Sequence, residues 1–138
     1  MTRIADLHHR HVMTVPMAPG AVARARETAE DVYRAWGINR AHPVMGPALL
    51  ILSELVANSV RHAATASPQA TVTYAAGADV LAFAVHDRHP HQPDLVEFAV
   101  AGGGLAMIAE LTAELGGTCT VRPDADGGGK NMWITLPL

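Results

Sequence analysis

The feature that most constrains the fold is a long helical pattern, PVMGPALLILSELVANSVRHAA, which runs from Pro43 to about residue 64. Proline is tolerated in the first turns of a helix, so Pro43 and Pro47 indicate where this helix begins. One face is apolar and would meet the core, and it consists of Leu52, Leu55, Val56, Ser59, Val60 and Ala63. Such a face needs a second layer to cover it, and 138 residues are enough for one domain with one core.

A polar stripe lies beside the apolar face of this helix. Glu54, Asn58 and His62 follow one another at four-residue intervals, and four residues advance a helix by about 40° beyond a full turn. The three side chains therefore lie along one stripe that turns gradually around the helix axis. A carboxylate, an amide and an imidazole suit a proton acceptor, a ligand for a hard cation and a contact to an anion.

Shorter patterns on both sides of this helix predict the remaining elements. Residues 11–17 alternate like a strand, and residues 19–37 have apolar positions at helical spacing. Downstream we expect strands at 70–76, 79–87, 117–123 and 130–138, a loop at 89–101, and a helix at 105–116. This order predicts an α+β two-layer sandwich, with the helices on one face of a mixed, mostly antiparallel sheet. We expect a single domain over residues 12–138 and an N-terminal tail at 1–11.

Composition excludes several classes of function. The formal net charge of −3 argues against a protein that binds nucleic acid directly, because such a protein needs a basic face. No apolar run approaches the roughly 20 residues that span a bilayer, and the N-terminus lacks the apolar segment of a signal peptide. The single cysteine, Cys119, fits a reducing compartment. We therefore expect a cytoplasmic protein with no membrane partner.

Two further features could take part in chemistry, and each has a structural alternative. Three glycines at 102–104 precede a helix, where free N–H groups and backbone access favour phosphate, although a plain loop would use the same residues. Asp87 ends an apolar strand and could accept a hydrogen bond from an exocyclic amine, or it could simply begin a turn with Arg88.

Together these motifs, in this order, resemble the GHKL ATPase superfamily, and most of all its stand-alone anti-sigma-factor serine kinases. The resemblance covers residues 12–138. SELVANSVRHA is similar to the N box of the family, VHDRHP stands where its first glycine box begins, and GGGLAMIAELTAELG is similar to its second. The closing GGGKNMWITLPL is similar to the final hairpin. The resemblance implies the Bergerat fold of these ATPases.

The resemblance also implies a role for each site residue. Glu54 would be the general base, and Asn58 the side-chain ligand of Mg²⁺. The other ATP-binding residues would be Arg61 and His62 near the phosphates, Asp87 at the adenine amine, and Gly102, Gly103, Gly104 and Leu105 as the phosphate cradle. An amide oxygen plus phosphate oxygens suits Mg²⁺, which keeps several waters.

The sequence departs from the family pattern in two places. Residues 88–91, RHPH, stand where the family usually has glycines, and Lys130 stands where histidine kinases often have a small hydroxyl residue. A different class of function, a histidine-rich metal site, could draw on His8, His9 and His11 or on His86, His89 and His91, although neither group has a known zinc spacing.

The function expected from the resemblance is an ATP·Mg²⁺-binding regulator. It would phosphorylate a serine or threonine of an anti-sigma antagonist and sequester a sigma factor, and a homodimer is compatible with this role. The alternative is a non-catalytic switch that binds nucleotide or a protein partner and transfers nothing. The base at Glu54 favours the kinase.

Overall fold

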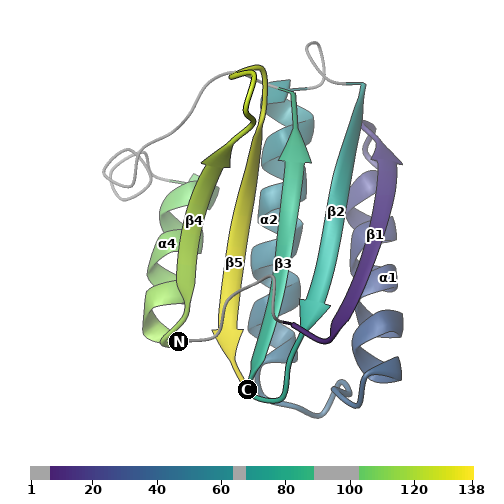
Figure 1. Cartoon of the computed structure of the whole chain (residues 1–138), viewed down its shortest axis with the longest axis vertical. Helices are drawn as coiled ribbons and strands as arrows, with labels where there is room; N and C mark the ends of the chain where they lie inside the picture. The colour runs from purple at the N-terminus through teal and green to yellow at the C-terminus, as the bar shows by residue number, and fades with distance from the viewer. Residues whose placement is uncertain (1–6, 64–67, 89–102) are drawn as a thin grey trace.

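The structure is a computed structural model that describes residues 7–63, 68–88 and 103–138. Helices and strands follow one another as expected (Figure 1). The elements are β1 (His9–Pro16), α1 (Ala21–Ala35), α2 (Met45–Ala63), β2 (Gln69–Ala76), β3 (Val80–Asp87), α4 (Gly103–Glu114), β4 (Thr118–Pro123) and β5 (Lys130–Pro137). The predicted α+β class is confirmed, with three described helices packed on a five-stranded sheet.

The strand order in the sheet is β1-β2-β3-β5-β4. Each pairing between the described strands is antiparallel, so this part of the chain contains none of the parallel pairs that a mixed sheet would need. The last strand, β5, enters between β3 and β4. Because β5 pairs with β3 in the antiparallel sense, Lys130 at the beginning of β5 lies opposite Asp87 at the end of β3, 43 positions away in the chain.

The three helices cover one face of the sheet, as Figure 1 shows. Side chains alternate between the two faces of a strand, so Leu81, Phe83 and Val85 of β3 enter the core under the helices. From α2, Leu55 and Val56 are almost fully buried against them. A buried aliphatic side chain stabilises a fold by about 1.5–3 kcal/mol, so this interface fixes how α2 lies on the sheet.

Two buried tyrosines join α1 to the sheet. The hydroxyl of Tyr33 donates to the carbonyl of Ala82 at 2.6 Å, and the hydroxyl of Tyr74 donates to the carbonyl of Ala25 at 2.7 Å. Burial raises the pKa of the Tyr33 hydroxyl well above its ordinary value, so it stays a donor at every physiological pH. These bonds satisfy polar groups that would otherwise be buried without a partner.

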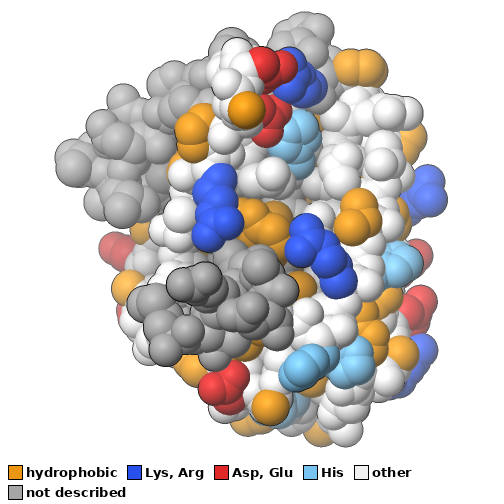
Figure 2. Space-filling model, in the orientation of Figure 1, with side chains coloured by type: hydrophobic (Ala, Val, Ile, Leu, Met, Phe, Trp, Pro, Cys, Tyr) orange, Lys and Arg blue, Asp and Glu red, His pale blue; other side chains and the backbone are white. Residues whose placement is uncertain are grey.

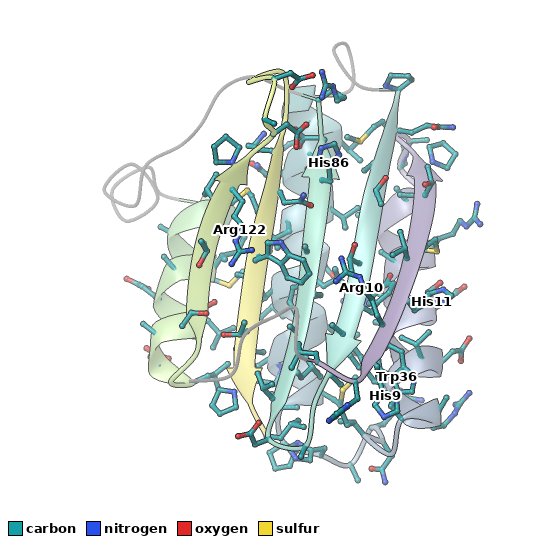
Figure 3. The ribbon with its side chains drawn as sticks, viewed as in Figure 1. His9, Arg10, His11, Trp36, His86 and Arg122 are labelled. Atoms are coloured by element: carbon teal, nitrogen blue, oxygen red, sulfur yellow. The ribbon has the colours of Figure 1, made fainter. Side chains whose placement is uncertain are left out.

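No described helix lies on the opposite face of the sheet, as Figure 1 shows, and Figure 2 shows this face in the same orientation. A small cluster of Ala75, Ala82, Ala84 and Trp133 lies there, with Leu7 packed against it. The guanidinium of Arg10 is 6.0 Å from the ring centroid of Trp133, within the range of a cation–π contact. Figure 3 shows Arg10 and Arg122 on this face. These neighbours leave Trp133 only 6% exposed.

Several element boundaries differ from the prediction by one or two residues, and two of these differences bear on the site end or the sheet edge. β1 begins at His9 rather than at residue 11, because His9 pairs with Ala76 of β2. Helix α4 begins at Gly103 rather than at residue 105. The expected loop at 89–101 lies outside the described residues. Among the described residues, the helices are all too short or too polar to cross a bilayer.

Candidate functional site

Three chain segments that carry predicted site residues lie toward one end of the molecule, and the beginning of β5 joins them there. Figure 1 shows the C-terminal ends of α2 and β3 at its upper end, together with the first residues of β5 and α4. Antiparallel pairing of β3 with β5 produces this arrangement, as does the packing of α4 against α2. The packing therefore brings the last turns of α2, the end of β3 and the first turn of α4 toward the same end of the fold.

Helix α2 supplies the polar stripe. Glu54 and Asn58 are half-buried, at the border between the core face of α2 and solvent, and Arg61 is exposed in the last turn. His62 lies in the same helix, but its side chain is outside the described part of the structure. The apolar neighbours Leu55 and Val56 hold this face of α2 in place because they are buried against the sheet.

Asp87 is the best-defined polar group of the region. It is the last residue of β3 and lies on the same face of the sheet as Phe83 and Val85, toward the helices. Only 3% of the residue is exposed. The hydroxyl of Ser59 donates to its Oδ2 at 2.9 Å, and the ammonium of Lys130 donates to its Oδ1 at 2.9 Å. The carboxylate therefore joins α2, β3 and β5.

Ser59 connects Asp87 to the stripe on α2. It follows Asn58 in the sequence, and neighbouring helix positions differ by about 100° around the axis. Ser59 therefore faces Asp87 while Asn58 points toward the border with solvent at the same height along the helix. Glu54 lies about one turn earlier on the Asn58 side.

Two members of this group, Ser59 and Lys130, are not among the site residues predicted from the sequence. Ser59 was placed with the apolar face of α2, and a hydroxyl among aliphatic residues indicates a buried acceptor nearby. Lys130 stands where histidine kinases often have a small hydroxyl residue, so the family pattern does not point to it. Lysine is almost never fully buried unless it is paired, so a lysine that begins an apolar strand could have indicated a carboxylate opposite it.

A second polar cluster holds the β4–β5 hairpin against the end of β3. His86 Nε2 lies 2.9 Å from Asp124 Oδ2, and Arg88 bonds Asp124 at 2.8 Å and Asp126 at 3.0 Å. The hydrogen bond from Arg88 holds the pKa of Asp126 below its usual value, with help from the backbone N–H of Gly128. Figure 3 shows His86 at this end of the sheet, on the face away from the helices.

Gly129 brings the hairpin still closer to β3. A β-carbon at this position would lie 2.6 Å from the carbonyl oxygen of Asp87 and 2.6 Å from Asp124 Oδ2, which is too close for any side chain. The glycine therefore lets the backbone at the beginning of β5 touch the backbone at the end of β3. This contact sets Lys130 directly opposite Asp87 in the strand register.

The glycine motif lies partly outside the described residues. Gly102 is not described, whereas Gly103, Gly104 and Leu105 form the first turn of α4. The first N–H groups of a helix have no partner within it and carry partial positive charge. Backbone groups at this turn are thus of the kind that binds phosphate oxygens.

The histidines form no metal site in the described residues, since no three His, Cys, Asp or Glu side chains there are arranged to hold an ion. His9 instead stacks on Trp36, with ring centroids 5.1 Å apart, as Figure 3 shows. His86 is engaged with Asp124. His89 and His91 lie outside the described residues.

Comparison with solved structures supports the fold. The chain is similar to the histidine kinase domain of the blue-light activated histidine kinase from Erythrobacter litoralis EL346, with 20% identity and a TM-score of 0.51 over 90% of this chain. It spans 62% of that domain. It is also similar to a chain of the SiaB–SiaC complex from Pseudomonas aeruginosa, with 13% identity and a TM-score of 0.51, over 93% of this chain and 89% of that one.

Comparison with protein families is more specific than the structural likeness. No curated protein sequence matches the chain. The family described as the histidine kinase-like ATPase domain matches residues 15–135, which is almost the whole chain. The protein therefore belongs to the histidine kinase-like ATPase domain family, in agreement with the GHKL resemblance of its motifs.

Proposed function

We propose that this protein binds ATP and Mg²⁺, phosphorylates a serine or threonine of an anti-sigma antagonist, and sequesters a sigma factor in the cytoplasm. The observation that carries the nucleotide part is the meeting of three elements at Asp87. Ser59 reaches this carboxylate from the helix that also carries Glu54 and Asn58. Membership of an ATPase family supports a nucleotide-binding regulatory role.

The side chains of α2 fit the proposed cofactor. Asn58 would hold Mg²⁺ through its amide oxygen, a hard donor that is half-exposed at the border of the helix. Bound Mg²⁺ neutralises phosphate charge and orients the terminal phosphate. Arg61 and His62 would contact phosphate oxygens from the last turn of α2, and Gly102, Gly103, Gly104 and Leu105 would do so from the beginning of α4.

Glu54 would act on the protein substrate. A carboxylate about one turn before Asn58 would lie near the phosphate end of the nucleotide and could accept the proton of an attacking hydroxyl. Asp87 would accept a hydrogen bond from the exocyclic amine of adenine at the other end. A module that only bound nucleotide would have no need of a base at position 54, which favours the kinase.

The partner part of the proposal draws support from one similar protein. SiaB was solved in complex with SiaC, so a protein of this fold forms a complex with a second protein. We propose that the present chain likewise binds a protein that accepts phosphate. The alternative, a non-catalytic switch, would bind the same nucleotide and the same kind of partner without transfer.

Equilibrium binding of ATP with and without Mg²⁺ tests the proposal. ATP·Mg²⁺ at about 100 times its dissociation constant should stabilise the fold by roughly 2.7 kcal/mol. For a domain of this size the melting temperature should rise by about 5–10 °C. Asn58→Ala should lose the Mg²⁺-dependent part of binding. Asn131→Ala is the matched control, because Asn131 is half-buried on β5 and pairs across from His86, on the face away from the helices.

The possible results of these binding measurements distinguish a nucleotide site on α2 from a general effect on the fold. Loss of Mg²⁺-dependent binding in Asn58→Ala, with Asn131→Ala unchanged, supports the site on α2. A well-folded wild-type protein that shows no shift with millimolar ATP would refute nucleotide binding. Equal loss in both variants would mean that the effect of Asn58 is a general one on the fold.

A further inference from the structure

Lys130 is a buried cation that the proposed reaction does not use. Its side chain is 9% exposed and that of Asp87 is 5% exposed, so nearly all of this ion pair is removed from solvent. Strand register places the two residues directly opposite each other, and the close approach at Gly129 holds the backbones in that position. The four-carbon stem of lysine is still flexible, so the ammonium can move although its backbone cannot.

The ammonium competes with adenine for the same acceptor. Lys130 has three N–H donors and no acceptor, and the exocyclic amine of adenine also donates. Both groups therefore seek the oxygens of Asp87. Oδ1 already accepts from Lys130 and Oδ2 from Ser59, and the residue is only 3% exposed.

We propose that Lys130 is an intramolecular latch on the base pocket. It occupies the carboxylate that would receive the adenine amine, and it must leave Asp87 before a nucleotide can make that contact. This inference rests on the proposed function, since it concerns how the same site is regulated. The latch lowers the affinity of the resting protein for ATP and reduces its ability to distinguish adenine from other bases.

The latch predicts that removing the positive charge of Lys130 strengthens the binding of ATP. ATP carries several negative charges, so removing a nearby lysine would ordinarily weaken its binding. If Lys130 is the latch, Lys130→Thr should instead bind ATP more tightly. In this variant the hydrogen bond between Lys130 and Asp87 no longer has to be broken when ATP binds, so the affinity for ATP should rise about tenfold or more.

Two variants serve as matched controls. Lys130→Arg keeps a cation opposite Asp87 and should leave the ATP affinity close to that of the wild type. Arg122→Thr removes a positive charge from the same hairpin, but Arg122 is exposed on β4 and pairs across from Asn131. It should leave affinity unchanged or weaken it slightly.

A nucleotide without the exocyclic amine, purine riboside triphosphate, gives a second measurement that needs no variant. With the latch closed, the wild-type protein should bind it and ATP within about threefold of each other. The Lys130→Thr variant should prefer ATP by about tenfold, because Asp87 is then available to the amine. If Lys130→Thr does not fold, the wild-type comparison alone decides.

The possible outcomes distinguish the latch from the site itself. Tighter binding of ATP by Lys130→Thr, together with a new preference for the amine, supports the latch. Equal or weaker binding by a folded Lys130→Thr overturns the latch and leaves the proposed function standing. A tenfold preference of the wild type for ATP likewise overturns the latch. If neither triphosphate binds any variant, the proposed function and the latch both fail.

Discussion

The buried pair of Asp87 and Lys130 leads to a large and specific effect on stability. Lys130→Met keeps most of the length of the side chain and removes the charge. The carboxylate of Asp87 then stays buried, still bonded to Ser59 but without the cation opposite it. Removing one partner of a buried pair costs about 3–5 kcal/mol, because the other charge is left in a medium of low dielectric. A domain of this kind has roughly 5–15 kcal/mol in total.

Removing both charges should restore most of this loss. In the double variant Asp87→Leu with Lys130→Met, no charge remains buried, and well-packed apolar replacements of buried pairs are often neutral or more stable by about 1–4 kcal/mol. The two changes should therefore be strongly non-additive, as expected for side chains in direct contact.

Urea unfolding of the wild type, the two single variants and the double variant measures this coupling. A surface pair provides the control. Arg34 and Asp31 are 3.0 Å apart on α1 with side chains 63% and 68% exposed, so Arg34→Met should cost about 0–1 kcal/mol. If Lys130→Met costs no more than Arg34→Met, or if the single costs simply add, the two charges do not depend on each other and the reasoning is refuted.

Three further predictions concern single residues. Gly129→Ala should destabilise the fold by about 1–3 kcal/mol in the same urea assay, because the added β-carbon would overlap the carbonyl oxygen of Asp87. Gly20→Ala is the control and should not destabilise the fold, because the space around Gly20 is open. Burial raises the pKa of the Cys119 thiol from 9.0 to about 11, so the stability that its protonated form contributes is complete below pH 9 and is lost as the pH rises through 11. Alkylation of the native protein at pH 8 should be correspondingly slow, with roughly a hundredfold less thiolate than a free cysteine; a rate equal to that of the unfolded chain contradicts this. Glu54→Gln should reduce the rate of phosphate transfer by about 10²–10⁴ with little change in ATP binding. Glu27→Gln, on the exposed face of α1, is the control and should change neither quantity. Transfer is measured with labelled ATP and candidate antagonist proteins, and a wild-type rate in Glu54→Gln would exclude Glu54 as the base.

The parts of the fold that depend on local sequence were predictable. The helix that became α2 carries its own signals, with a proline just before its first turn and one apolar face. The β4–β5 hairpin was indicated by glycines between two apolar strands, and Gly127 indeed has a positive φ of 72°. Each of these patterns needs only neighbours in the chain.

The parts that depend on pairing between distant segments were not predictable in the same way. The beginning of β1 at His9 depends on Ala76, which supplies its partner in β2. The position of β5 between β3 and β4 brings together segments that are distant in the chain. Because Lys130 meets Asp87 only through that strand order, a buried ion pair could not be read from either residue alone.

The latch sets an upper limit on the ATP affinity that Lys130→Thr can gain, and that limit is the folding stability that the same variant loses. If Lys130 bonds Asp87 only in the nucleotide-free state, its free energy stabilises that state and opposes binding by the same amount. Lys130→Thr can then gain no more affinity than the free energy that the nucleotide-free fold loses. An affinity gain of about tenfold corresponds to roughly 1.4 kcal/mol, well below the roughly 3–5 kcal/mol expected for removing one partner of a buried ion pair. A gain that exceeded the measured loss of stability would mean that Lys130 also disturbs the bound complex, and the latch would then be only part of its effect.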